Sequence, residues 1–133
     1  MFIGKSGAIL LGYPGTTQDV VVFPRKDVEN GRKIVAALTD LGFDNNDAVK
    51  GEIVRCKDFV QIKNGPFDID LVFAPDGIES YDEAKARIDI STGFPVANIR
   101  DIIESKRAAK RPRDAIELPQ LQAFREEYEK RRR

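Results

Sequence analysis

Residues 12–23 read GYPGTTQDVVVF and place a glycine-bounded turn directly before four apolar strand-forming residues. The uninterrupted run from Val20 to Phe23 predicts a central strand that is covered on both faces. Asp19 stands at the mouth of that strand, and the hydroxyls of Thr16 and Thr17 before it can hydrogen-bond the loop backbone. An acid in this place is either a capping aspartate or a ligand of a metal or phosphate site, and the stretch alone leaves both interpretations open.

A second strand with acidic side chains follows later in the chain. Residues 67–73, FDIDLVF, alternate between apolar and acidic side chains. This alternation puts Asp68 and Asp70 on one face of the strand and the apolar residues on the other. If the strands of Asp19 and Asp70 are neighbours, their carboxylates converge and can share one divalent cation.

The rest of the chain alternates between helix and strand signals. Capping residues and helical spacing predict a helix that Asp27 or Asn30 caps and that ends near Leu41, a helix over 81–88 that Ser80 caps, and a helix over 97–109. We further expect a strand stub at 1–3, one or two helical turns at 8–11, a hairpin of strands 52–56 and 59–63, and a last helix over 119–131 after a break at 111–113. Interleaved helices and strands predict an α/β fold, a small mixed β-sheet flanked by helices, in a single domain over residues 1–133.

Composition narrows the chemistry that the chain can perform. It has no histidine and a single cysteine, Cys56. Catalysis by Ser-His or Cys-His pairs and metal sites built from histidine or several cysteines are therefore excluded. A metal would be a hard cation held by oxygen, with Mg²⁺ or Mn²⁺ the natural candidates. No apolar run is long enough to span a bilayer and no signal peptide is evident, so we expect no membrane partner and a cytoplasmic location.

The zero net charge hides a basic C-terminal end. Residues 105–133 contain ten Lys/Arg and five Asp/Glu, whereas residues 1–104 carry an excess of acids. Such a helical end suggests binding to phosphate or to RNA, although a solvated tail explains it as well. Lys106 extends the apolar stripe of Val96, Ile99, Ile102 and Ile103, so its ammonium either points into an opening of the core or reaches solvent at the helix end.

Four motifs follow one another along the chain, namely Gly4-x-x-Gly7-Ala8, Gly12-Tyr13-Pro14-x-Thr16-Thr17-x-Asp19, Ile69-Asp70-Leu71-Val72 with Asp76-Gly77-Ile78, and Ser105-Lys106-Arg107-Ala108-Ala109-x-Arg111-Pro112-Arg113-Asp114. In this order they resemble the minimal nucleotidyltransferases of the polymerase-beta-like superfamily, some of which act in toxin–antitoxin or phage-defence pairs. The likeness extends from about Ile3 to Phe124. The resemblance implies a nucleotidyltransferase-like fold and transfer of a nucleotidyl group from an NTP to a hydroxyl of RNA or protein, with weakly bound Mg²⁺ or Mn²⁺.

The resemblance also implies roles for individual residues. Asp19 matches the first metal-binding carboxylate of an Asp-x-Asp pair, and Asp70 matches a third carboxylate that binds metal or activates the acceptor hydroxyl, with Asp68 as the fallback. Lys106 matches a lysine that steadies the triphosphate. The remaining nucleotide-binding positions are the loop Gly4-Lys5-Ser6, whose amides approach the phosphates, and Thr17.

Two positions depart from the family pattern. Val21 stands where the second acid of the pair is expected, and Gly15 stands where an arginine often precedes the threonines. Loss of one metal carboxylate weakens a site in which the metal contributes several kcal/mol to such transfers. The alternative function is therefore a catalytically impaired homologue that binds a nucleotide, a nucleic acid such as tRNA, or a cognate partner protein of a toxin–antitoxin pair.

Overall fold

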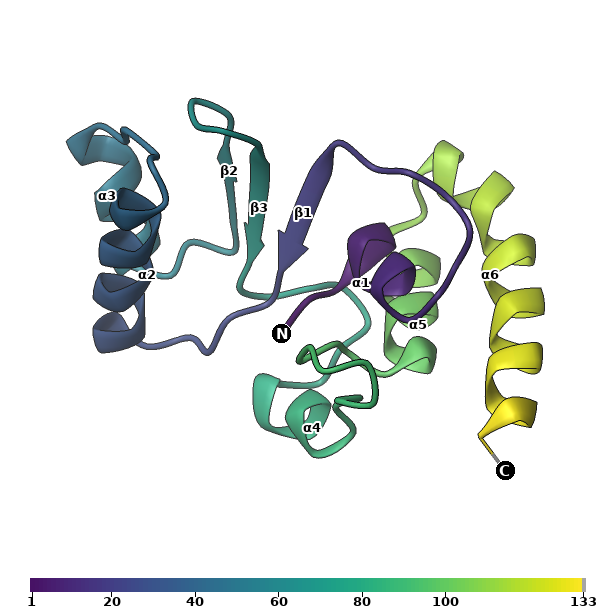
Figure 1. Cartoon of the computed structure of the whole chain (residues 1–133). Helices are drawn as coiled ribbons and strands as arrows, with labels where there is room; N and C mark the ends of the chain where they lie inside the picture. Colours follow the sequence, from purple (N-terminus) through teal and green to yellow (C-terminus); the bar gives the residue numbers. More distant parts are fainter. Residues whose placement is uncertain (133) are drawn as a thin grey trace.

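A small mixed sheet lies at the centre of the molecule, with helices on both sides (Figure 1). The computed structural model describes residues 1–132. Within this range the chain forms α1 (Gly4–Leu10), β1 (Asp19–Val22), α2 (Val28–Asp40), α3 (Asp47–Val54), β2 (Phe59–Ile62), β3 (Asp68–Val72), α4 (Tyr81–Ala86), α5 (Ile99–Ala109) and α6 (Pro112–Arg131). The predicted α/β class with a small mixed sheet is confirmed.

The strand order is β1-β3-β2, with β1 parallel and β2 antiparallel to β3. The prediction that Val20–Phe23 forms the central strand is therefore wrong, because β3 is central and β1 lies at the edge of the three strands. The exposed edge of β1 is closed by the N-terminal stub, where the Ile3 N–H donates to Val21 O (3.0 Å) and the Phe23 N–H donates to Met1 O (2.7 Å). The apolar run of β1 thus reflects this cover and packing on both faces, which sequence periodicity does not distinguish from a central position.

The predicted strand over 52–56 is also wrong. Residues 47–54 form α3, and the Asn46 side chain caps it by accepting the Val49 N–H (2.9 Å). Val49 and Ile53, four residues apart, both face the core beneath the sheet. The hairpin pairs β2 with β3 instead, with Ile62 opposite Ile69 and Phe59 opposite Val72.

The other helices follow their capping signals, with one correction at the C-terminal end. Asp27 caps α2 and Ser80 caps α4 as predicted. The last helix was expected from about 119, but α6 begins at Pro112, a favoured first helical position, after Lys110 takes a left-handed conformation. Pro119 lies inside α6 and does not end it.

Two apolar cores flank the sheet. One lies between the sheet and α2 and α3 and includes Ile53, Ile62 and Leu71. The other lies among α1, α4, α5 and α6 and includes Ile102 and Leu121. Because the apolar residues of β3 enter the first core, its acidic face is left toward α1 and α5 (Figure 1). No helix within residues 1–132 is both long and apolar enough to cross a membrane.

Candidate functional site

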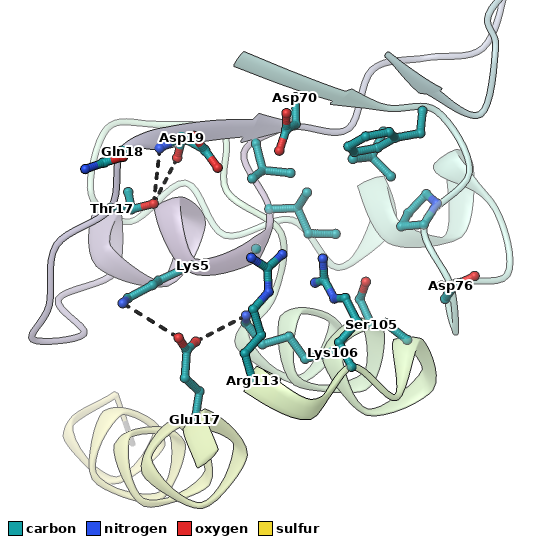
Figure 2. Close-up of a pocket in the computed structure, with 18 of the residues that line it drawn as sticks. Lys5, Thr17, Gln18, Asp19, Asp70, Asp76, Ser105, Lys106, Arg113 and Glu117 are labelled. Carbon is teal, nitrogen blue, oxygen red and sulfur yellow. Dashed lines mark hydrogen bonds and ion pairs between the residues drawn. The ribbon is translucent and has the colours of Figure 1, made fainter. Parts of the chain in front are cut away.

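A cavity of about 680 Å³ opens between the acidic face of the sheet, the start of α1 and the corner where α5 turns into α6. Figure 2 shows Asp19 and Asp70 on the sheet side of this cavity, and Lys5 and Lys106 on the opposite side with Glu117 between them. All the predicted site residues except Ser6 line it, namely Gly4, Lys5, Thr17, Asp19, Asp70 and Lys106. The fold therefore brings together residues that are up to a hundred positions apart in the chain.

The two predicted carboxylates lie on neighbouring strands. Asp19 is opposite Asp68 and Val21 is opposite Asp70, so Asp19 and Asp70 are diagonal neighbours on one face of the sheet. Burial raises the pKa of Asp70, and the nearby negative charge of Asp19 raises it further, against the opposing effects of Lys63 and Gln61. Asp68, the fallback acid, does not line the cavity.

These carboxylates fit the donor set of a hard cation. Mg²⁺ is commonly held by one or two carboxylates together with waters and the phosphates of the substrate. The residues 1–132 contain no cluster of three or more His, Cys, Asp or Glu suited to a metal. A cation held by Asp19 and Asp70 would need its remaining ligands from water or from a bound molecule.

Val21 fills the space between these acids and α1. A Cβ atom added to Gly4 would lie 3.3 Å from Cγ2 of Val21, so the valine methyls pack directly against the first turn of α1. Gly4 also has φ of +66°, a left-handed conformation that favours glycine. The position at which the resemblance expects a second acid is therefore a packing contact.

Lys5 and Ser6 have different surroundings although they are adjacent. The Ser6 hydroxyl is buried, donates to Ile3 O (3.1 Å) and accepts the Val21 N–H (2.9 Å), so it ties α1 to β1. Lys5 lines the cavity, and its Nζ lies 3.7 Å from Oε1 of Glu117. Its side chain also passes over Gly15, where an added Cβ would lie 3.4 Å from Cε of Lys5. Lys5 thus brings a positive charge to the place where the expected arginine is absent.

Thr17 fixes the entry to β1. Its hydroxyl accepts the Asp19 N–H (3.3 Å) and donates to Asp19 O (3.2 Å). These two bonds to one residue hold the backbone of Asp19 at the rim of the cavity (Figure 2). The predicted bonding of the loop backbone by a threonine hydroxyl is confirmed for Thr17.

Lys106 points inward, which decides between the two interpretations of the sequence. It is only 8% exposed, and its Nζ lies 3.4 Å from Asp114 and 3.3 Å from Glu117. Asp114 is 1% exposed and also accepts a hydrogen bond from Arg111 (2.9 Å). Burial opposes ionisation of Asp114, but the Arg111 hydrogen bond and the charge of Lys106 outweigh it and lower its pKa. Lys106 is thus a fixed cation in the wall of the cavity.

Sequence reasoning missed three residues of this site. Glu117 of α6 joins the two lysines, Arg113 reaches the cavity without an ion pair or hydrogen bond to any described residue, and Phe59 of β2 lines the far end. The position of Glu117 beside the two lysines depends on where α6 folds back, and no local sequence pattern indicates this. Arg113 was visible only as part of a motif, and Phe59 as one alternating position of a strand.

No model of a protein family matches the chain, and no curated protein matches it. The function must therefore be inferred from the cavity and its side chains.

Proposed function

We propose that the cavity binds a nucleoside triphosphate together with Mg²⁺ or Mn²⁺ and transfers its nucleotidyl group to a hydroxyl of RNA or protein. The observation that supports this proposal is the opposition of charges across one cavity. Asp19 and Asp70 lie on the sheet, and Lys5, Lys106 and Arg113 face them from the helices. A polyphosphate with a divalent cation is complementary to both walls at once.

The chemistry requires few protein groups. The acceptor oxygen attacks the α-phosphorus, the bond from that phosphorus to the bridging oxygen of pyrophosphate breaks, and pyrophosphate leaves with its added negative charge. Asp70 takes the proton of the acceptor hydroxyl as a general base, because its carboxylate lies on the cavity wall beside the bound nucleotide. Lys5 and Lys106 stabilise the charge on the pyrophosphate. A cation held by Asp19 and Asp70 would neutralise charge on the phosphate oxygens.

The proposal includes the fold family and the partners that the sequence resemblance implies. A nucleotidyltransferase-like fold accords with a small mixed sheet that presents acids from two neighbouring strands. An acceptor RNA, such as tRNA, would bind to the basic C-terminal end. The protein would also bind a cognate partner protein, as members of toxin–antitoxin pairs do. Arg113, at the start of α6, is the cation best placed to contact a phosphate backbone beside the cavity.

A second candidate function is an impaired homologue that binds nucleotide without turning it over. The packing of Val21 against Gly4 favours it, because an apolar contact occupies the position of the expected acid. With two carboxylates, the site can hold one cation far better than two. This arrangement favours binding over the two-metal route of catalysis.

Transfer of label from each of the four α-labelled NTPs to total tRNA or added protein tests the proposal. We expect slow, metal-dependent labelling by the wild type, loss of labelling in Asp70→Asn, and retention in Asp68→Asn, whose side chain shares the strand but not the cavity. No labelling by the wild type with a gain in Val21→Asp would favour the binding module. No labelling by either protein would leave nucleotidyl transfer unsupported.

A further inference from the structure

Four apolar residues, Phe59, Val72, Ala74 and Pro75, also line the cavity. Phe59 is opposite Val72 in the β2–β3 ladder, two residues along the same face from Asp70. Its side chain is 48% exposed, and it is the one exposed large apolar residue within 1–132 that lines this cavity. Single exposed apolar residues are ordinary, but an aromatic ring on the wall of a polar cavity offers a planar surface to a ligand.

The two ends of the cavity therefore differ in the side chains that line them. Figure 2 shows Lys5 and Thr17 at one side and Asp76 at the other, with Asp70 between them. Two residues of a strand advance about 7 Å, so the Phe59–Val72 pair lies one such step past the carboxylate of Asp70. Asp58 and Asp76 also line the cavity, next in sequence to Phe59 and Pro75. The carboxylate of Asp58 is paired with Lys26 at 3.3 Å, so it is the charge of Asp76 that disfavours a polyphosphate at this end.

We propose that Phe59 is the platform on which the nucleobase of the bound nucleotide stacks. This inference rests on the proposed function, because it requires the triphosphate to occupy the end with Lys5 and Lys106. Repulsion at Asp76 and attraction at the lysines then orient the ligand with its base toward Phe59. Val72 extends the apolar surface beside the ring. Stacking on one aromatic face tolerates all four bases, so this contact gives affinity for a nucleotide over a bare polyphosphate rather than selection among bases.

A tryptophan at this position reports the contact directly. The chain contains no tryptophan, so Phe59→Trp introduces a single fluorophore. We expect Mg²⁺–ATP to quench its fluorescence saturably and Mg²⁺–tripolyphosphate to leave it unchanged. Phe94→Trp is the matched control, since Phe94 is equally exposed, at 48%, and does not line the cavity. Its fluorescence should change with neither ligand.

Calorimetric titration of Phe59→Ala tests base stacking on Phe59 separately from the proposed binding of a nucleotide in the cavity. We expect about tenfold weaker binding of Mg²⁺–ATP, unchanged binding of Mg²⁺–tripolyphosphate and recovery of ATP affinity in Phe59→Tyr. Wild-type affinity for ATP in Phe59→Ala would overturn the stacking role and leave the proposed function standing. Failure of the wild type to bind either ligand would overturn both.

Discussion

At the scale of single residues, Asp70 makes the stability of the folded protein depend on pH. Its pKa in the folded protein is raised, chiefly by burial and then by Asp19, so the folded state favours the protonated form. The stabilisation from that proton is fully present below the unfolded-state pKa of about 4 and is lost as pH rises through the folded-state pKa. Asp70→Asn stays neutral at every pH and should be more stable than the wild type at pH 7, with the difference shrinking toward pH 4.

Urea denaturation at a series of pH values checks this expectation. Asp68→Asn is the comparison variant, because it removes a carboxylate from the same strand outside the cavity. The charge of Asp68 makes the smallest contribution to the raised pKa of Asp70, so this variant should change the pH dependence much less than Asp70→Asn. If the wild type is as stable as Asp70→Asn at pH 7, the partly buried charge of Asp70 does not lower the free energy of unfolding.

Glu117 competes with a polyanionic ligand for the lysines. Its carboxylate lies 3.7 Å from Lys5 and 3.3 Å from Lys106, so an incoming phosphate must share both cations with it. Glu117→Gln removes one negative charge from the cavity, and we expect tripolyphosphate to bind about three- to tenfold more tightly. Calorimetry measures the change, with Glu127→Gln, on the same helix but outside this cavity, as control. Equal or weaker binding by Glu117→Gln would contradict the competition.

The residues of the site differ in how far sequence can predict them. Asp70 follows from strand alternation and Lys106 from the stripe of a helix, because these patterns fix which face a side chain takes. Asp19 was indicated only by its place before an apolar strand and by the family resemblance. Whether Lys106 points inward depends on Asp114 and Glu117, which only the return of α6 brings near. The predicted role of Ser6 is that its backbone amide approaches a phosphate. Its hydroxyl bonds the backbone of Ile3 and Val21, a local contact that a motif does not reveal.

At the scale of elements, replacing two helical glycines by alanine should have opposite effects on the stability of the protein. A Cβ at Gly31 of α2 would lie 2.7 Å from the Ile53 carbonyl oxygen and 2.9 Å from Val54 Cα, both backbone atoms of α3. A Cβ at Gly51 of α3 would meet only the end of the Arg55 side chain, at 3.1 Å. Gly31→Ala should therefore destabilise by about 1–3 kcal/mol through forced separation of the helices. Gly51→Ala should stabilise by up to about 1 kcal/mol through helix propensity.

The free energy of unfolding in urea decides between these effects. Each protein is the control for the other, because both substitutions add the same methyl group to a helix of the same pair. Stabilisation by Gly31→Ala would mean that α2 and α3 are less closely packed than these distances indicate.

Elements with capping residues were predictable, and short apolar segments were not. Asp27 and Ser80 each accept the N–H three residues later, a bond that sequence spacing predicts. Residues 52–56 read as a strand because a short β-rich segment carries no period of its own, and the cap at Asn46 and the packing of Ile53 decided for a helix. The central place of β3 rather than β1 depends on non-local pairing, which no local pattern contains.

At the scale of the whole molecule, the sheet separates two apolar cores and leaves one polar face between them. The apolar residues of β3 pack in the core under α2 and α3. Val21 of β1 packs against the other core, which lies among α1, α4, α5 and α6. The cavity lies between these two regions, with Asp19 and Asp70 on strands and Lys5, Lys106 and Arg113 on helices. Such a site is held by the fold as a whole and not by one loop.

The central claim is that this cavity binds a metal-bound nucleoside triphosphate through Asp19 and Asp70. Its most direct test is calorimetric titration of the wild-type chain with ATP, with and without Mn²⁺, beside Asp70→Asn and Asp68→Asn. We predict binding by the wild type that requires Mn²⁺, loss of that binding in Asp70→Asn, and wild-type binding in Asp68→Asn. Equal Mn²⁺-dependent binding by Asp70→Asn, or no binding by the wild type, would contradict the claim.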